Sequence, residues 1–167
     1  MNSNGVWKLA IELGISHAKP TIEPALTFED PKNTRFFNQR SEKRLKQRED
    51  MILTSDQLFS ATLKKYKNLA YNVFMGDDSR LLFPGHEPII GKSNITDFLR
   101  NKEIQISTEP TKADRATGSD LAYTYGKAVI TSKGIESKYN YVRIWEVQED
   151  HKWNVIVELF SPAGEPE

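Results

Sequence analysis

The residue in this sequence best suited to chemistry is Arg143, which lies in the segment Tyr139 to Trp145. Strand alternation places Tyr139, Tyr141, Arg143 and Trp145 on one face of a sheet. A guanidinium clamped among aromatic rings favours a small anionic or carboxylated ligand, because its planar fork matches a carboxylate. The pattern equally allows an outward-facing Arg143 that pairs with a glutamate on a neighbouring strand, and both arrangements stay open.

Two carboxylates, Asp78 and Glu158, are candidates for a general acid or base, a role that needs a buried carboxyl with a raised pKa. Asp78 follows Gly76 and Asp77 where a helix is expected to end, and aspartate is common in such turns. Alternation places Glu158 on the strand face opposite to Trp153. For both, the favoured interpretation is therefore structural: a turn residue for Asp78, and a solvent-facing or dimer-facing carboxylate for Glu158.

Other catalytic patterns are missing from the sequence. His17, His86 and His151 show no metal-ligand spacing, and there is no Cys to supply a thiolate. The glycines do not form a phosphate-binding loop, and no arrangement of Ser, His and Asp stands out as a nucleophile triad. The sequence therefore predicts no metal and no cofactor.

Charge and hydropathy exclude several kinds of partner. The 167 residues contain 23 Lys plus Arg and 23 Asp plus Glu, so the net charge is zero. A neutral chain gives no general electrostatic reason to bind nucleic acid or an acidic membrane, and no run is apolar enough to span a bilayer. The first residues do not resemble a signal peptide. The compartment stays open, since a longer protein containing this chain can still be exported.

Periodicity predicts helices first and a meander of long strands afterwards. Apolar residues recur at helical spacing from Leu58 to about Phe74, with Thr54 or Ser55 as the N-cap. The expected strands cover residues 80–83, 87–91, 104–116, 121–131, 138–148 and 153–161, with a brief helix over residues 95–100. This order indicates an α+β fold in which a curved sheet folds over the helices.

The chain divides into three parts: an isolated strand over residues 1–16, a proline-containing and then charged linker over 17–49, and a domain over 50–167. The charged residues 40–49 also suit the polar first turns of a helix. Trp7 and Trp153 are each followed by Glu and Leu at the same spacing, which favours an internal repeat over a chance match. We therefore expect residues 1–16 to be the last strand of a preceding tandem copy, loosely docked, disordered or paired with an exposed edge.

Several short segments of the domain together resemble the ketosteroid-isomerase-like (SnoaL-like, nuclear-transport-factor-two-like) superfamily, close to its uncharacterised tandem bacterial members. The segments are Asp77 to Gly85, Ile90-Gly91-Lys92, Ser119 to Gly126, Tyr141 to Trp145, Lys152-Trp153 and Phe160-Ser161. The resemblance implies a cystatin-like roll: a cone-shaped, curved antiparallel or mixed sheet wrapped around a long N-terminal helix, with a pocket at its wide end. It also implies a homodimer through the outer sheet face.

The resemblance implies a pocket whose charged group is Arg143, with the aromatic and histidine candidates Tyr141, Trp145, Phe83, Phe74, His86 and Trp153. The residues of a ketosteroid isomerase oxyanion hole cannot be matched, so that activity is not predicted. The favoured function is binding of a small, carboxylated ligand without catalysis. Two alternatives stay open: an acid–base enzyme, either an isomerase or a hydrolase of unknown substrate, and a dimerising interaction module without a ligand.

Overall fold

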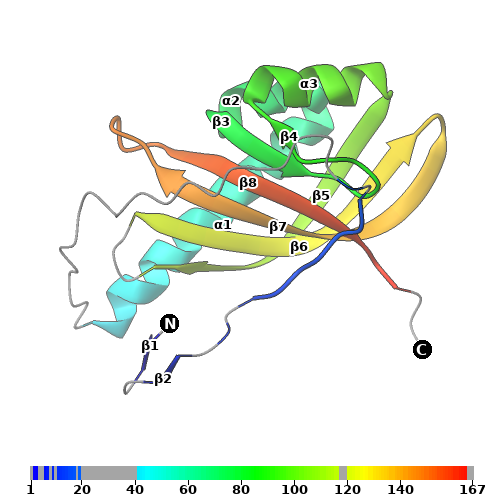
Figure 1. Ribbon diagram of the computed structural model, residues 1–167. Coiled ribbons are helices and arrows are strands. Elements are labelled where there is room, and N and C mark those ends of the chain that lie inside the picture. Colours follow the sequence, from blue (N-terminus) through cyan, green and yellow to red (C-terminus); the bar gives the residue numbers. More distant parts are fainter. Residues whose placement is uncertain are drawn as a thin grey trace.

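The computed structural model describes residues 2–3, 6–7, 9, 11–17, 19, 41–116 and 120–164. Its main elements are one long helix, two short helices and a six-stranded sheet (Figure 1). In chain order they are β1 (Asn2–Ser3), β2 (Val6–Trp7), α1 (Glu42–Tyr66), the 3-10 helix η1 (Lys67–Ala70), α2 (Tyr71–Phe74), β3 (Met75–Leu82), β4 (Ile89–Ile90), α3 (Lys92–Asn101), β5 (Ile104–Arg115), β6 (Leu121–Ser132), β7 (Ile135–Val147) and β8 (Trp153–Pro162).

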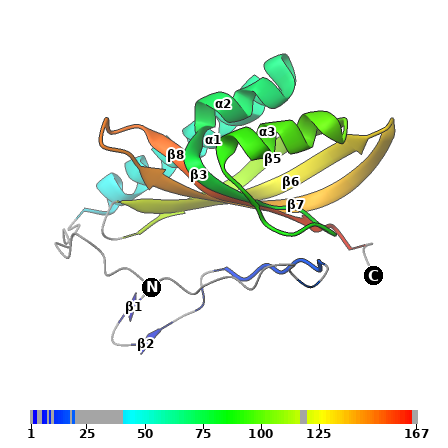
Figure 2. The same ribbon diagram turned by 45° about the horizontal axis from the view of Figure 1, so that its top comes forward.

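The sheet has the order β4-β3-β8-β7-β6-β5 and is mixed, because β3 runs parallel to β8 while all other neighbours are antiparallel. It curves around α1, and the helices pack on its concave face (Figures 1 and 2). The predicted α+β fold with a curved sheet and a long N-terminal helix is confirmed. The space between helix and sheet is filled by buried side chains of both layers.

The long helix begins earlier than the sequence pattern indicated. Thr54 and Ser55 do not cap it; their hydroxyls donate to the carbonyls of Asp50 and Met51, one turn back inside α1. The charged stretch expected to be linker therefore forms the first two turns of the helix, starting at Glu42. Lys, Arg, Glu and Gln are good helix formers, and an exposed helical segment needs no apolar stripe.

A change of backbone direction at Lys67 divides the helical region that the pattern indicated would run unbroken to Phe74. Lys67 has φ 52° and ψ −139°, and its N–H donates to the carbonyl of Leu63 as α1 ends. A residue with positive φ cannot continue a right-handed helix. The chain then resumes as η1 and α2, and Tyr71 becomes completely buried against the core.

Two bulges set which strand residues face inward. The pairing of β5 with β6 shifts between Pro110 and Lys112, and Gly126 faces this bulge so closely that a Cβ there would lie 2.1 Å from the carbonyl oxygen of Glu109. The pairing of β7 with β8 shifts after Ile144, which leaves Ile156 as an extra residue on β8. Before Ile156 the odd-numbered Val155 faces inward, whereas after it the even-numbered Glu158 and Phe160 do.

The N-terminal segment lies on the convex face of the sheet, opposite α3 (Figure 2). The isolated strand expected over residues 1–16 does not form as one piece: β2 pairs with β1, and residues 11–17 form no strand. Ile11, Leu13 and Ile15 are half-buried while the residues between them are exposed, and the carbonyl of Ser16 accepts a 2.9 Å hydrogen bond from the N–H of Gly85. We call residues 11–16 the N-terminal strap.

Parts of two predictions lie outside the described residues: most of the proline-containing linker, and most of the connection between the strands expected over residues 104–116 and 121–131. In the described part of the chain, no helix has an apolar stretch long enough to cross a bilayer.

Candidate functional site: an arginine buried between two carboxylates

Arg143 lies at the centre of the core, between the long helix and the sheet. Its Nη1 donates to Oδ1 of Asp56 from α1, and its Nε donates to Oε1 of Glu158 from β8 at 2.7 Å. All three side chains have no exposed surface. We call Asp56, Arg143 and Glu158 the buried ion cluster; it ties the helical layer to two adjacent strands.

Hydroxyl groups extend the cluster on the α1 side. Tyr141 donates to the second oxygen of Asp56 at 2.9 Å, so that carboxyl accepts on both oxygens. Nη2 of Arg143 makes a long 3.5 Å contact with Oγ1 of Thr108, which hydrogen-bonds Ser60 at 2.7 Å. The polar groups around Asp56 are therefore largely satisfied, as buried polar groups must be.

Aromatic rings enclose the guanidinium. Its carbon lies 4.0 Å from the ring centroid of Phe59 and 4.7 Å from that of Tyr141, which are cation–π distances. Phe59 in turn stacks on Phe74 at 4.7 Å and meets Tyr71 edge-on at 5.4 Å. The cluster thus sits in an apolar shell that excludes water and strengthens its electrostatic interactions.

The charges in the cluster do not balance, because one guanidinium faces two carboxyl groups. Burial raises the pKa of Glu158 above its ordinary value, and the opposing effects of Arg143 and Tyr71 do not cancel the increase. Oε2 of Glu158 and the hydroxyl of Tyr71 are buried and make no hydrogen bond of ordinary geometry within the described residues, although each influences the pKa of the other. Glu158 is therefore the carboxyl suited to hold a proton.

Tyr71, Tyr141 and Arg143, which surround the two carboxyls, keep their protons and so act as hydrogen-bond donors. Burial, followed by the charge of Glu158, raises the pKa of Tyr71 well above its usual value, and burial likewise raises the pKa of Tyr141. Burial lowers the pKa of Arg143, but Asp56 and Glu158 more than reverse this and leave it raised. Both tyrosines keep their protons and Arg143 keeps its charge at neutral pH.

Arg143 takes the inward arrangement, and the outward-facing one does not occur. Its side chain is buried on the same face as Tyr141 and Trp145, as alternation predicted for these three residues, and one of its partners is nevertheless a glutamate of the neighbouring strand. The interpretation of Glu158 as an outward carboxylate is wrong, since the bulge at Ile156 turns both Val155 and Glu158 inward.

The remaining sequence candidates occupy different places. Trp145 is fully buried and donates to Thr124 at 2.9 Å. Phe83 and half-buried His86 form an aromatic group with Phe98, at centroid distances of 4.9–5.9 Å. Asp78 is exposed on β3 and does not join the cluster.

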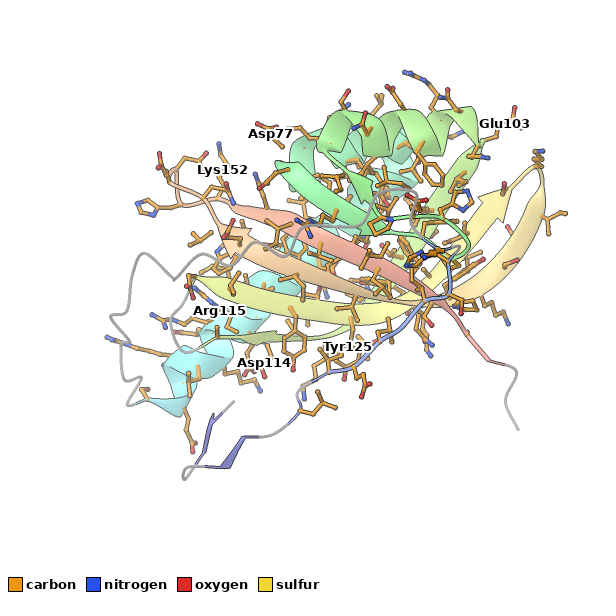
Figure 3. The ribbon with its side chains drawn as sticks, in the orientation of Figure 1. Asp77, Glu103, Asp114, Arg115, Tyr125 and Lys152 are labelled. Carbon is orange, nitrogen blue, oxygen red and sulfur yellow. The ribbon has the colours of Figure 1, made fainter. Side chains whose placement is uncertain are left out.

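Two other candidates border the cluster or lie apart from it. Phe74 packs on Phe59 beside the cluster, whereas Trp153 is half-buried below the guanidinium of Arg115, 4.5 Å from its ring centroid. Figure 3 shows Arg115 and its neighbour Asp114 near the first half of α1. Among the described residues no group of three His, Cys, Asp or Glu side chains could hold a metal.

Sequence reasoning missed Asp56 and Tyr71. Asp56 occupies the buried stripe of α1 between Ile52 and Phe59, at spacings of four and three residues. An aspartate in an apolar helical stripe was the available signal, because a lone buried carboxyl needs a partner. Tyr71 gave no comparable signal, since its inward direction depends on the break at Lys67.

The cluster is closed. Four cavities lined by described residues have no lining from Asp56, Arg143 or Glu158; one of them, of about 810 Å³, lies between η1, α3 and the start of β5. Tyr71 and Phe74, which belong to α2, are the aromatic residues of the η1–α2 segment that pack over the cluster.

Comparison with solved structures finds many matches, and three of them have a sequence identity of 12–15%. A ketosteroid isomerase-like protein from Erwinia carotovora atroseptica SCRI1043 matches with a TM-score of 0.59 and 14% identity, over 75% of this chain and 100% of the other. A nuclear-transport-factor-two-like protein of unknown function from Pseudomonas putida KT2440 matches with a TM-score of 0.58 and 15% identity, over 73% and 91%. An LEH-like epoxide hydrolase from M. tuberculosis matches with a TM-score of 0.51 and 12% identity, over 68% of this chain and 80% of the other.

No protein-family model matches the chain, and no curated protein sequence matches it. The likeness to solved structures is one of fold, and it agrees with the resemblance found in the sequence segments. The chain has the ketosteroid-isomerase-like, nuclear-transport-factor-two-like fold.

Proposed function

We propose that the domain is an acid–base enzyme of the hydrolase type, which adds water to a small uncharged electrophile at the buried ion cluster. The observation that carries this proposal is the imbalance of the cluster: two carboxyl groups share one guanidinium, and Glu158 has a raised pKa and a buried oxygen without a partner. Pairs of carboxyls set apart by their surroundings are typical of acid–base sites.

The roles follow from the contacts. Glu158, holding a proton, is the general acid, and Tyr71 beside it is a second donor to the developing oxyanion. Asp56, held by Arg143 and Tyr141, is the base that orients and deprotonates water. Arg143 is a positioning residue that fixes both carboxyls around one guanidinium.

A strained cyclic ether such as an epoxide suits these roles. The oxygen of water attacks one ring carbon, the carbon–oxygen bond breaks, Glu158 gives its proton to the departing oxygen, and Asp56 takes a proton from the water. The product is a diol, and transfer of the proton from Asp56 to Glu158 restores the site. One of the structural neighbours is described as an epoxide hydrolase, which supports the choice of substrate class.

This proposal replaces the carboxylated ligand that the sequence favoured. A ligand carboxylate would have to displace one of the protein's own carboxylates from Arg143, in a space enclosed by aromatic rings. A neutral, apolar substrate avoids that cost. It would enter by displacement of the η1–α2 segment, which begins at the strained backbone of Lys67 and carries Tyr71.

The test is hydrolysis of a panel of small epoxides in water enriched in ¹⁸O, followed by mass spectrometry of the diols. Wild-type protein is expected to incorporate one label per turnover. Glu158→Gln and Asp56→Asn should each lower kcat about 100-fold or more, the usual contribution of a general acid or base. Glu136→Gln, an exposed carboxyl of β7, is the matched control.

Near-ultraviolet circular dichroism of the three variants separates loss of chemistry from loss of packing. No turnover by well-folded wild-type protein on any epoxide would reject the proposed substrate class. Undiminished kcat in both cluster variants, with turnover in wild type, would show that the cluster is not the catalytic site.

A further inference from the structure

A groove at the end of α1 has the features of a second binding site, separate from the buried ion cluster. It lies between η1, the last turns of α3 and the start of β5, and its volume is about 810 Å³. This is within the usual range for small-molecule sites, about 300–1,000 Å³. It shares no residue with the cluster, so it does not depend on the function proposed above.

The floor and one wall of the groove are apolar. Leu99 and Ile104 are buried core residues at its base. Tyr66 and Leu69, at the end of α1 and in η1, line the same groove with 52% and 67% of their surface exposed. Two large exposed apolar side chains beside an apolar floor form a surface that an apolar ligand would cover.

The rim of the groove is mainly cationic. Lys67 and Lys133 stand on η1 and the β6–β7 hairpin, and in the described part of the chain neither makes an ion pair. Arg100 of α3 also lines the groove and pairs with Asp97 at 2.6 Å. The acidic rim residue is Glu103, which Figure 3 shows at the end of α3. The balance favours an anion.

A polar acceptor at the groove is unused. The Nδ2 of Asn68 donates to the carbonyl of Ile104 at 2.7 Å, whereas its Oδ1 is buried and has no hydrogen-bond partner in the described residues. An unpaired buried acceptor is unfavourable, and each instance in a native structure calls for an explanation. An N–H or O–H group of a ligand would satisfy it.

The backbone at the rim is also unusual. Lys67, Glu103 and Lys133 have positive φ without being glycine. Lys133 is explained by the tight hairpin turn that it makes with Gly134. Lys67 and Glu103 occupy left-handed positions that glycine would accept without strain, and such residues cluster at ligand sites.

We propose that this groove binds a small amphiphile with an apolar body and a single anionic head, either a carboxylate or a phosphate monoester. The body lies on Leu69 and Leu99, and the head lies between Lys67 and Lys133. Oδ1 of Asn68 is satisfied by a hydroxyl or amide N–H that the ligand carries beside the head, because an ionised carboxylate only accepts hydrogen bonds. Two flexible lysines at a solvated rim suit an exposed head group, whereas the closed cluster accepts none.

Calorimetric titration with decanoate and with decyl phosphate, both below their critical micelle concentrations, tests the proposal. Decanol and decyltrimethylammonium are the neutral and cationic comparisons. Either anion or both should bind, and which one binds distinguishes the head groups. Lys67→Gln and Lys133→Gln should each raise Kd about fivefold, and Leu69→Ser should raise it further. Lys127→Gln, on the convex face, should leave Kd unchanged.

Equal affinity for decanol and decanoate would overturn the proposal, because it removes the role of the cations. Unchanged Kd in both rim lysine variants would overturn it as well, and so would association seen only above the micelle concentration. Since all the substituted side chains are exposed, thermal unfolding of the variants should match that of wild type. Heteronuclear NMR shifts confined to Asn68 and its neighbours in the groove would support it.

Discussion

Replacing Glu158 by Gln should change how the stability of the protein depends on pH. The carboxyl is buried, and its pKa lies above the ordinary value of 4.5. The folded protein therefore holds a proton that the unfolded chain releases once the pH exceeds about 4.5. Deprotonation of the folded state begins only at its raised pKa, so stability falls as the pH rises between these two values.

The size of the effect follows from linkage. Across this window the unfolded state binds one proton fewer, so the free energy of unfolding decreases by about 1.4 kcal/mol for each pH unit. Gln keeps the shape of Glu and can accept from Nε of Arg143 while its amide group faces Tyr71. The variant should therefore match wild type near pH 4.5, become more stable than wild type as the pH rises towards the raised pKa of Glu158, and keep a constant advantage above that pKa.

Urea unfolding at each pH unit from 4.5 to 8.5, followed by fluorescence, measures both curves. Glu136→Gln controls for the loss of an exposed carboxyl, and its curve should run parallel to that of wild type. Parallel curves for wild type and Glu158→Gln would refute the reasoning, because they would mean that Glu158 titrates alike in the folded and unfolded states.

Three further changes have distinct outcomes. Arg143→Met leaves two buried carboxyls without their cation and should lower the free energy of unfolding in urea by about 3–5 kcal/mol, whereas replacing the whole buried ion cluster by apolar residues should restore most of it. Gly126→Ala places a Cβ 2.1 Å from the carbonyl oxygen of Glu109 and should cost about 1–3 kcal/mol in the same assay. Deleting residues 1–19 should uncover the convex face around Tyr125 and produce a dimer in light scattering.

Each of these three changes has a matched control variant. Arg100→Met removes an exposed arginine and Gly164→Ala adds a methyl group in open space, so both should be close to neutral. Deleting only residues 1–7 keeps the N-terminal strap and should leave the oligomeric state of the full chain unchanged. An oligomeric state that the longer deletion does not change would contradict the prediction that the strap covers a dimer surface.

The strands β5 to β8 could be predicted from the sequence because each is an alternating or apolar run bounded by turn residues. The first half of β3 could not: Asp78, interpreted as a turn residue, lies in this strand, which begins at Met75. The first two turns of α1 could not be assigned from the sequence, since charged residues suit both a helix and a linker. Of the buried ion cluster, the sequence pointed to Arg143 as the charged group of a pocket, but it did not identify both of its carboxylate partners. Glu158 was missed as an inward residue because a single extra residue, Ile156, reverses the parity on which alternation depends. Asp56 was missed because its partner lies 87 positions away in the sequence.

The separation of 87 positions between Asp56 and Arg143 implies an order in which the contacts of the buried ion cluster form during folding. Arg143 and Glu158 are 15 residues apart on adjacent antiparallel strands, so their pair can form as soon as the β7–β8 hairpin closes. Asp56 can join only when the long helix docks across a much larger loop, whose closure has a greater entropic cost. Until α1 docks, the β7–β8 hairpin carries the Arg143–Glu158 pair on the face that becomes buried in the folded protein. Asp56 therefore contributes late, and its removal should accelerate unfolding while leaving the folding rate nearly unchanged.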